Sequence, residues 1–363
     1  MSNPFFPPQT DILPLTTIRR DRVMPWRGEV LVRTGQRLEA SDIVARAGRP
    51  RPLVILDVAQ KLSISRRDAD QCVRKEPGES VRQGETLAQH KQGLWRTRKI
   101  SAPVEGLVIA VNGGRIVIRP VPELYELAAL MPGVVTKVAA AVGVTIETTG
   151  ALVQCAWGSG KEGSGVLKMG VSAPDETMSA QQIDLGHRGA VLVCGSTLDQ
   201  SVLDRAGSNQ VRGLIAGSVP AGLITALGRQ HIPVIVTEGI GNIPLAKPAF
   251  DLLTANEGRE AIVLAQTPAR WLAVRPEIII PLPSLGAPQM APQPGAPLAI
   301  GNRVRIRRDP YLGFTGAIRV LHDEPRSLEN GVRSPGAEVD LDGGGVVFVP
   351  YLNLELIGGE RRG

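Results

Sequence analysis

The sequence predicts a multidomain protein that combines all-β parts with one α/β part. A chain of 363 residues is too long for one ordinary core and favours two or three domains. Aromatic residues make up only 3% of it, whereas it holds 41 glycines and 29 prolines, so we expect short elements joined by tight turns. Period-two alternation in several segments indicates half-buried strands, and apolar runs separated by helical patterns indicate an α/β sheet.

Composition and cysteine usage favour a cytoplasmic protein. Hydrophobic residues make up 43% and charged residues 21% of the chain, as in soluble globular proteins. The three cysteines, Cys72, Cys155 and Cys194, are far apart and show no CxxC spacing, so we expect neither a disulfide framework nor a zinc site. The N-terminal segment lacks signal-peptide features, and no apolar run approaches the ~20 residues of a membrane helix.

The positive charge is concentrated in the first third of the chain. Residues 1–120 hold 21 Lys and Arg against 12 Asp and Glu, a net charge of +9. Residues 121–300 hold 11 against 14, and residues 301–363 hold nine against nine. Any nucleic-acid hypothesis has to account for this distribution.

The N-terminal part is expected to be β-rich. Residues 1–17 are rich in proline and are expected to form a disordered arm. Residues 18–170 contain three related stretches in which apolar and polar residues alternate and glycines mark sharp turns, as in paired short strands.

Within this part, the phrases PGESVRQGETLA and ISAPVEGLV resemble the barrel-sandwich hybrid fold of biotinyl and lipoyl carrier domains, over roughly residues 76–120. The resemblance implies that fold and a hairpin whose tip carries the modified lysine in carrier domains. The corresponding position here is Trp95, which offers no attachment point for biotin or lipoate. No cofactor is therefore expected.

The same hairpin tip is expected to be basic, because Trp95 is followed by Arg96, Arg98 and Lys99. A tryptophan among cations suits a nucleic-acid backbone or an acidic protein surface. The open alternative is a set of scattered cations on solvated strands.

Residues 171–275 are expected to form an α/β domain with a parallel sheet. Continuous apolar strands at 190–195, 211–218, 232–239 and 260–266 alternate with helical patterns of about ten residues, which is typical of a sheet covered by helices. Ligands of such sheets bind at the carboxyl ends of the strands, near helix N-termini. The candidate ligand loops there contain Ser196, Thr197, Ser218, Glu238, Gly239, Gly241 and Asn242. The alternative is that these glycines only permit tight turns.

A proline-rich linker over residues 276–299 is expected to hold a small terminal β-barrel at a distance from the α/β domain. The barrel covers residues 300–358, and residues 359–363 form a tail. Alternation in its first strand places Val304 and Ile306 inward and Arg303, Arg305 and Arg307 outward.

The phrase RVRIRRDPYLGFTGAIRVL resembles the KOW motif of NusG-type transcription factors and several ribosomal proteins. The resemblance implies a KOW or SH3-like small β-barrel that binds RNA or protein. Arg303, Arg305 and Arg307 would then contact phosphates and Tyr311 would stack on a base. Because the module is neutral overall, a protein partner or docking against the rest of the chain stays an open alternative.

No catalytic constellation is recognisable in the sequence. The four histidines fall in different modules without metal-ligand spacing, so neither a metal site nor catalysis is expected. The leading hypothesis is therefore a non-enzymatic binding or scaffold protein associated with transcription or translation. The two alternatives are a protein–protein adaptor that docks through the α/β domain, and a small-molecule sensor or enzyme that uses its strand ends.

Overall fold

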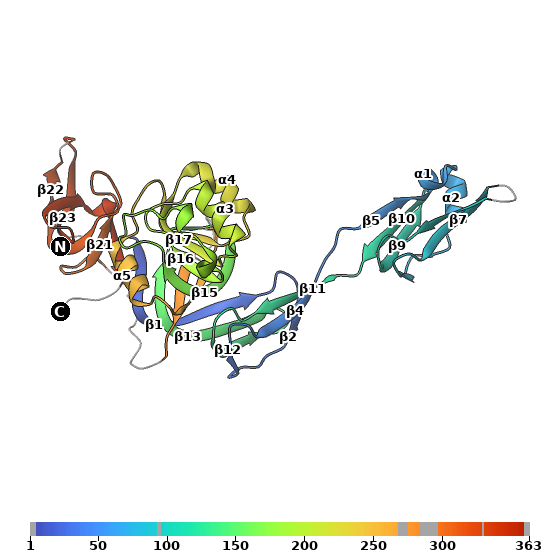
Figure 1. Ribbon diagram of the computed structural model, residues 1–363, viewed down its shortest axis with the longest axis horizontal. Helices are drawn as coiled ribbons and strands as arrows, with labels where there is room; N and C mark the ends of the chain where they lie inside the picture. Colours follow the sequence, from blue (N-terminus) through green and yellow to red (C-terminus); the bar gives the residue numbers. More distant parts are fainter. Residues whose placement is uncertain (1–4, 93–95, 268–274, 284–296, 329, 359–363) are drawn as a thin grey trace.

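The computed structural model describes residues 5–92, 96–267, 275–283, 297–328 and 330–358. The protein is mostly β and contains a large mixed sheet (Figure 1). One hydrogen-bonded path of strands joins an α/β part, a long β ribbon and a C-terminal module. A smaller unit, residues 54–120, lies apart from these at one end of the molecule and is called the distal unit below. No helix in the described ranges is long and apolar enough to cross a membrane.

The sheet of the α/β part is mixed, which corrects the expectation of a fully parallel sheet. Strands β15 (Lys161–Met169), β16 (Ala190–Val193), β17 (Gly213–Val219) and β18 (Val234–Ile240) are mutually parallel. In contrast, β19 (Glu260–Ala265) pairs antiparallel with β15, and the short β14 (Trp157–Gly158) pairs antiparallel with β18. A buried apolar run looks the same in either direction, so the sequence pattern identified β19 as a strand but not its orientation.

Helices cover both faces of this sheet. On one face, α3 (Gln200–Ser208) and α4 (Ile224–Arg229) pack on strand residues such as Leu192 and Leu214. On the other, α5 (Lys247–Ala255) packs on Val191 and Ile215. The short 3-10 segments are η1 (Ala180–Gln182), η2 (Leu185–His187) and η3 (Ala221–Leu223). Successive strand residues therefore point to opposite covered faces, which explains why these strands are apolar throughout.

A ribbon of two long antiparallel strands, β1 (Gln9–Val23) and β13 (Gly143–Gln154), leads away from the α/β part. Leu13 and Ile18 of β1 are each 1% exposed, so the ribbon has a well-buried face. Further strands extend and cover it, namely β2 (Gly28–Val30), β3 (Arg37–Leu38), β4 (Ile43–Arg49), β11 (Glu123–Ala128), β12 (Gly133–Ala139) and β20 (Glu277–Pro281).

Two sequence expectations are wrong here. The predicted disordered arm over residues 1–17 contributes β1, in which Pro14 falls at the irregularity between Leu13 and Thr16, where proline does not interrupt the ladder. The predicted linker over residues 276–299 begins with β20, whose three isoleucines are fully buried between β13 and β19. Residues 284–296 of that linker lie outside the described residues.

The C-terminal module consists of β21 (Arg303–Ile306), β22 (Thr315–Ser327), β23 (Arg333–Leu341), β24 (Val346–Pro350), η4 (Tyr351–Asn353) and β25 (Leu354–Gly358). It has its own core, which includes Val304, Ile318 and Leu354. Strand β25 pairs with β21 on one side and runs parallel to the start of β1 on the other. The module is therefore docked on the rest of the chain, which corrects the expectation that it sits at a distance on a tether.

The distal unit is inserted between β4 and β11, which pair with each other up to Arg49 and Glu123. Its four-stranded sheet has the order β5 (Val54–Asp57), β10 (Arg115–Pro120), β9 (Gly106–Asn112), β6 (Ser80–Val81). The hairpin β7 (Thr86–Gln92) and β8 (Arg96–Ser101) and the helices α1 (Val58–Leu62) and α2 (Arg66–Cys72) complete it. The unit encloses a separate hydrophobic core, with Leu62, Leu87 and Ile116 fully buried.

Candidate functional site

Arg305 of the predicted arginine strip is buried, which corrects the expectation that it faces solvent. Arg305 as a whole is 8% exposed. Val304 and Ile306 do enter the core of the C-terminal module as the alternation predicted. The opposite face of β21, however, lies against the end of β18 instead of water, because β25 joins the module to β1. Arg305 is therefore part of an interface inside the chain.

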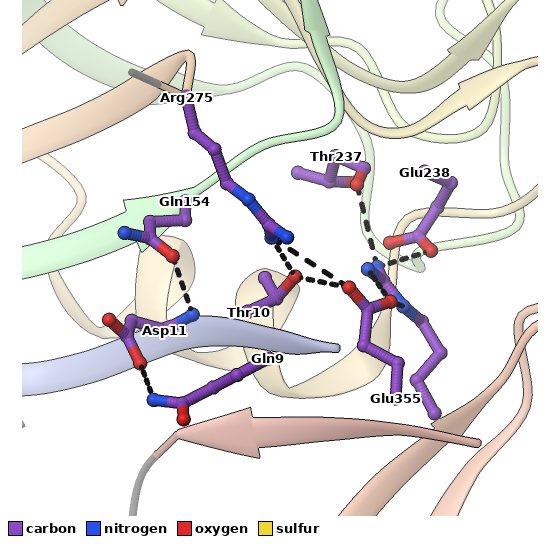
Figure 2. A network of polar contacts seen from close by, with 9 residues as sticks. Gln9, Thr10, Asp11, Gln154, Thr237, Glu238, Arg275 and Glu355 are labelled. Atoms are coloured by element: carbon purple, nitrogen blue, oxygen red, sulfur yellow. Dashed lines mark hydrogen bonds and ion pairs between the residues drawn. The ribbon is translucent and has the colours of Figure 1, made fainter. Parts of the chain in front are cut away.

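This interface is held by a network of charged and hydroxyl groups, the junction network (Figure 2). Arg305 Nη1 lies 2.5 Å from Glu238 Oε2, and its Nη2 lies 2.6 Å from Glu355 Oε2. The hydroxyl of Thr10 donates to Glu355 Oε1 at 2.6 Å, and Arg275 Nη1 donates to Thr10 Oγ1 at 2.7 Å. Five segments, namely β1, β18, β21, β25 and the short stretch before β20, thus meet through these five side chains.

The two carboxyl groups of the network experience opposite pKa shifts. Burial raises the pKa of the Glu238 carboxyl, and the attraction of Arg305 offsets only part of this effect. Burial also acts to raise the pKa of Glu355, but Arg305 and the hydrogen bond from Thr10 outweigh it and lower that pKa. The two glutamates contact different nitrogens of the Arg305 guanidinium, so one buried cation is paired with both carboxyl groups.

The other residues of the arginine strip have different surroundings. Arg303 forms a two-pronged ion pair with Asp342, with Nη1–Oδ1 at 2.6 Å and Nη2–Oδ2 at 2.5 Å. Tyr311 packs against the core of the module and meets Phe314 edge-on, with ring centroids 6.1 Å apart. Arg307 is exposed. Of the predicted contact residues in this module, Arg307 is thus the one whose charge reaches solvent without a carboxylate partner in the described part of the chain.

A cavity of about 430 Å³ lies beside the junction network. Its charged lining residues are Glu238, Arg275, Arg305, Arg307 and Glu355. It also has an apolar side, which includes Ile240, Ile243 and Leu312. The structure therefore brings together Glu238, predicted from the α/β strand ends, with Arg305 and Arg307, predicted from the C-terminal module.

The remaining residues of the predicted ligand loops do not line this cavity. The Ser218 hydroxyl accepts from the Ile243 N–H at 2.8 Å and lies 3.2 Å from the Gly241 carbonyl, so it closes the strand end. Ser196 is 5% exposed, Thr197 is half-buried, and Asn242 is exposed. Gly239 and Gly241 have φ values of 118° and 144°, which favour glycine. Their role in tight turns was the open alternative, and this geometry is consistent with it.

The end of the distal unit carries a second set of charges, called the distal cluster below. Arg98 and Lys99 of the predicted basic hairpin are exposed, whereas Trp95 and the side chain of Arg96 lie outside the described residues. Helices α1 and α2 pack beside the hairpin, and Arg98 Nη1 lies 3.4 Å from the hydroxyl of Ser63 at the end of α1. The described cluster comprises the exposed side chains of Lys61, Arg66, Arg67, Lys91, Arg98 and Lys99.

The distal cluster is free of ion pairs: among the described residues, none of its six cations lies within 4.0 Å of a carboxylate oxygen. The nearby acids have other partners, since Asp68 Oδ2 accepts from the hydroxyl of Ser65, the N-cap of α2, at 2.7 Å, and Asp70 accepts the Gly114 N–H at 2.8 Å. The sequence marked Arg66 and Arg67 as a separate basic pair and did not single out Lys61, because only folding places α1 and α2 beside the hairpin.

A cysteine–histidine pair inside the distal unit was also missed. Cys72 Sγ lies 3.5 Å from His90 Nδ1, and both residues are half-buried. The residues are 18 positions apart, and α2 meets β7 only in the folded unit. Within the described ranges, no group of three or more His, Cys, Asp or Glu side chains is placed to hold a metal ion.

Comparison of the chain with protein-family models and with curated proteins finds no match.

Proposed function

We propose that the protein is a non-enzymatic, cytoplasmic binding protein whose distal unit binds RNA or DNA, with the α/β part and the C-terminal module as its scaffold. The observation that carries this proposal is the distal cluster, six exposed cations without carboxylate partners among the described residues. Cations that are not neutralised within the protein are free to replace the counterions of a phosphate backbone, and that release drives binding.

Two further features support the distal unit as the contact surface. It lies at one end of the molecule, so a long polyanion can reach it without meeting the bulk of the protein (Figure 1). The first 120 residues also carry a net charge of +9, whereas residues 301–363 are neutral. A nucleic acid is favoured over an acidic protein because six cations spread over a hairpin and two helices match a continuous row of phosphates.

The two family resemblances concern the fold of the distal unit and that of the C-terminal module. We propose that the distal unit is of the barrel-sandwich hybrid type and that the C-terminal module is of the KOW type. Arg305 and Arg303 are neutralised by Glu238, Glu355 and Asp342, so the arginine strip contributes little to phosphate binding. The KOW-like module then acts mainly as a structural support.

The test compares two triple variants with the same change in charge. In the distal variant, Lys91, Arg98 and Lys99 are replaced by Gln, and in the matched control Lys137, Arg308 and Arg319, which are also exposed, are replaced by Gln. Binding of fluorescent RNA and DNA oligonucleotides, single- and double-stranded, is measured over a series of salt concentrations. The distal variant should reduce the slope of log K against log salt by about two to three for duplexes, and the control by much less.

Two results would count against the proposal. Equal losses in the two variants would indicate nonspecific attraction to net charge. Absence of binding to every oligonucleotide at low salt would leave an acidic protein as the partner, which cross-linking in cells would then identify.

A further inference from the structure

The cavity beside the junction network has the features of a ligand site that is separate from the distal cluster. It is formed by residues of β1, β18, β21 and β25 together with Arg275 and Pro276. Its volume of about 430 Å³ falls in the range of small-molecule sites, ~300 to 1,000 Å³. Its lining combines buried charged side chains, called the charged wall below, with apolar side chains, called the apolar wall.

The charged wall carries an excess of one positive charge. Three guanidinium groups, those of Arg275, Arg305 and Arg307, face two carboxylates, Glu238 and Glu355. Arg305 is committed to both carboxylates, with side-chain exposures of 9% for Arg305, 3% for Glu238 and 6% for Glu355. Arg275 Nη1 also lies 3.8 Å from Glu355 Oε1, so Arg307 supplies the uncompensated charge. The Arg275 side chain is 41% exposed, and Arg307 has no carboxylate within 4.0 Å among the described residues.

The apolar wall contains two large apolar side chains that are partly exposed. Ile240, at the end of β18, is 51% exposed, and Leu312, in the turn after β21, is 37% exposed. Both line the cavity together with Ile243. Large apolar side chains around a concave polar site are typical of sites that bind a ligand with an apolar body.

We infer that this cavity binds a small organic monoanion, a carboxylate with a short alkyl chain. Its carboxylate pairs with Arg307 and Arg275, and its chain covers Ile240 and Leu312. A single negative charge matches the excess of one positive charge, whereas a dianion such as inorganic phosphate would leave a charge uncompensated at a partly buried site. This inference goes beyond the proposed nucleic-acid function and does not depend on it.

The test uses the full-length protein and isothermal titration calorimetry with butyrate, hexanoate and octanoate. Octanamide and inorganic phosphate serve as the neutral and dianionic comparisons. We expect affinity to rise by about two- to fourfold per added methylene, and octanamide and phosphate to bind at least tenfold more weakly than octanoate.

Two neighbouring arginines provide a matched pair of variants. Arg307→Gln should weaken octanoate binding by about tenfold or more, because a charge-assisted hydrogen bond is lost. Arg308→Gln removes an adjacent exposed charge that does not line the cavity and should leave binding unchanged. A third variant, Leu312→Ser, should reduce octanoate affinity more than butyrate affinity.

Several outcomes would overturn the inference. They are no binding by any carboxylate, equal binding of octanamide and octanoate, and equal effects of the Arg307 and Arg308 variants. The distal triple variant should bind octanoate as the unaltered protein does, so this test and the nucleic-acid test fail independently.

Discussion

The two basic regions of the molecule look alike in sequence and differ completely in the folded protein. Residues 303–306 and residues 96–99 each place at least two cations in one strand. In β21, Arg305 lies between Glu238 and Glu355 and is buried. In β8, Arg98 and Lys99 face solvent. The alternation of apolar and polar residues thus determines on which face of a strand a side chain lies. The packing of other segments determines whether that face is in contact with water.

Removing the distal unit should have the largest effect, because it separates the two basic regions experimentally. Because Arg49 and Glu123 are paired neighbours in β4 and β11, a short Asn-Gly turn can replace residues 50–122. The distal core is separate, so the remaining protein should still fold, with an unfolding midpoint within a few degrees of the original, while nucleic-acid binding is lost. Circular dichroism and oligonucleotide titration measure the two effects. If the shortened protein still bound nucleic acid, the binding site would lie outside the distal unit, and the C-terminal module would be the next candidate.

Replacing Arg305 by Ala should have the next largest effect. It leaves Glu238 without its cation and Glu355 with only Arg275, 3.8 Å away. Breaking a buried ion pair in this way destabilises a protein by about 3–5 kcal/mol. Urea unfolding followed by circular dichroism measures the loss. Arg305→Met keeps the bulk but not the charge and should be comparably destabilising, whereas a change below about 1 kcal/mol in both variants would contradict the buried network.

The pH dependence of the unfolding free energy tests the contribution of Glu355 to stability. Its pKa is lowered in the folded protein, so it contributes stability that is present above its unfolded pKa and is lost as the pH falls through its folded pKa. Glu238 has a raised pKa and contributes a trend of the opposite sign, a stability that is lost as the pH rises past its unfolded value. Glu355→Gln should therefore be less stable near neutral pH and lose less stability on acidification, measured by urea unfolding from pH 7 to pH 3. Parallel pH profiles for the two proteins would contradict this.

Replacing Arg98 and Lys99 by Gln should have the smallest effect on stability. Both side chains are exposed and, within the described residues, form no ion pair, so the unfolding free energy should change by less than about 0.5 kcal/mol. The same urea experiment that tests Arg305 checks it. A large loss of stability would mean that the distal cluster serves the fold instead of a partner.

Local patterns in the sequence predicted the parallel strands of the α/β part and the inward face of β21. The apolar runs at 190–195, 211–218 and 232–239 became β16, β17 and β18, and the alternation around Val304 gave the correct inward face of β21. These features depend on local periodicity, which the sequence contains directly. The charge asymmetry along the chain is likewise a property of composition alone.

The pairing and direction of these elements, and the contacts between distant side chains, are set by the tertiary structure. The proline-rich start of the chain pairs with β25, the isoleucines after Pro276 fill the sheet, and β19 reverses its direction. Glu238, Arg305 and Glu355 are separated by 67 and 50 residues, yet they form one network. No local pattern encodes such pairings, because the groups meet only in the folded chain, where their mutual attraction offsets the cost of removing them from water. For the same reason, the sequence could name the cations of this protein but not which of them remain available to a ligand.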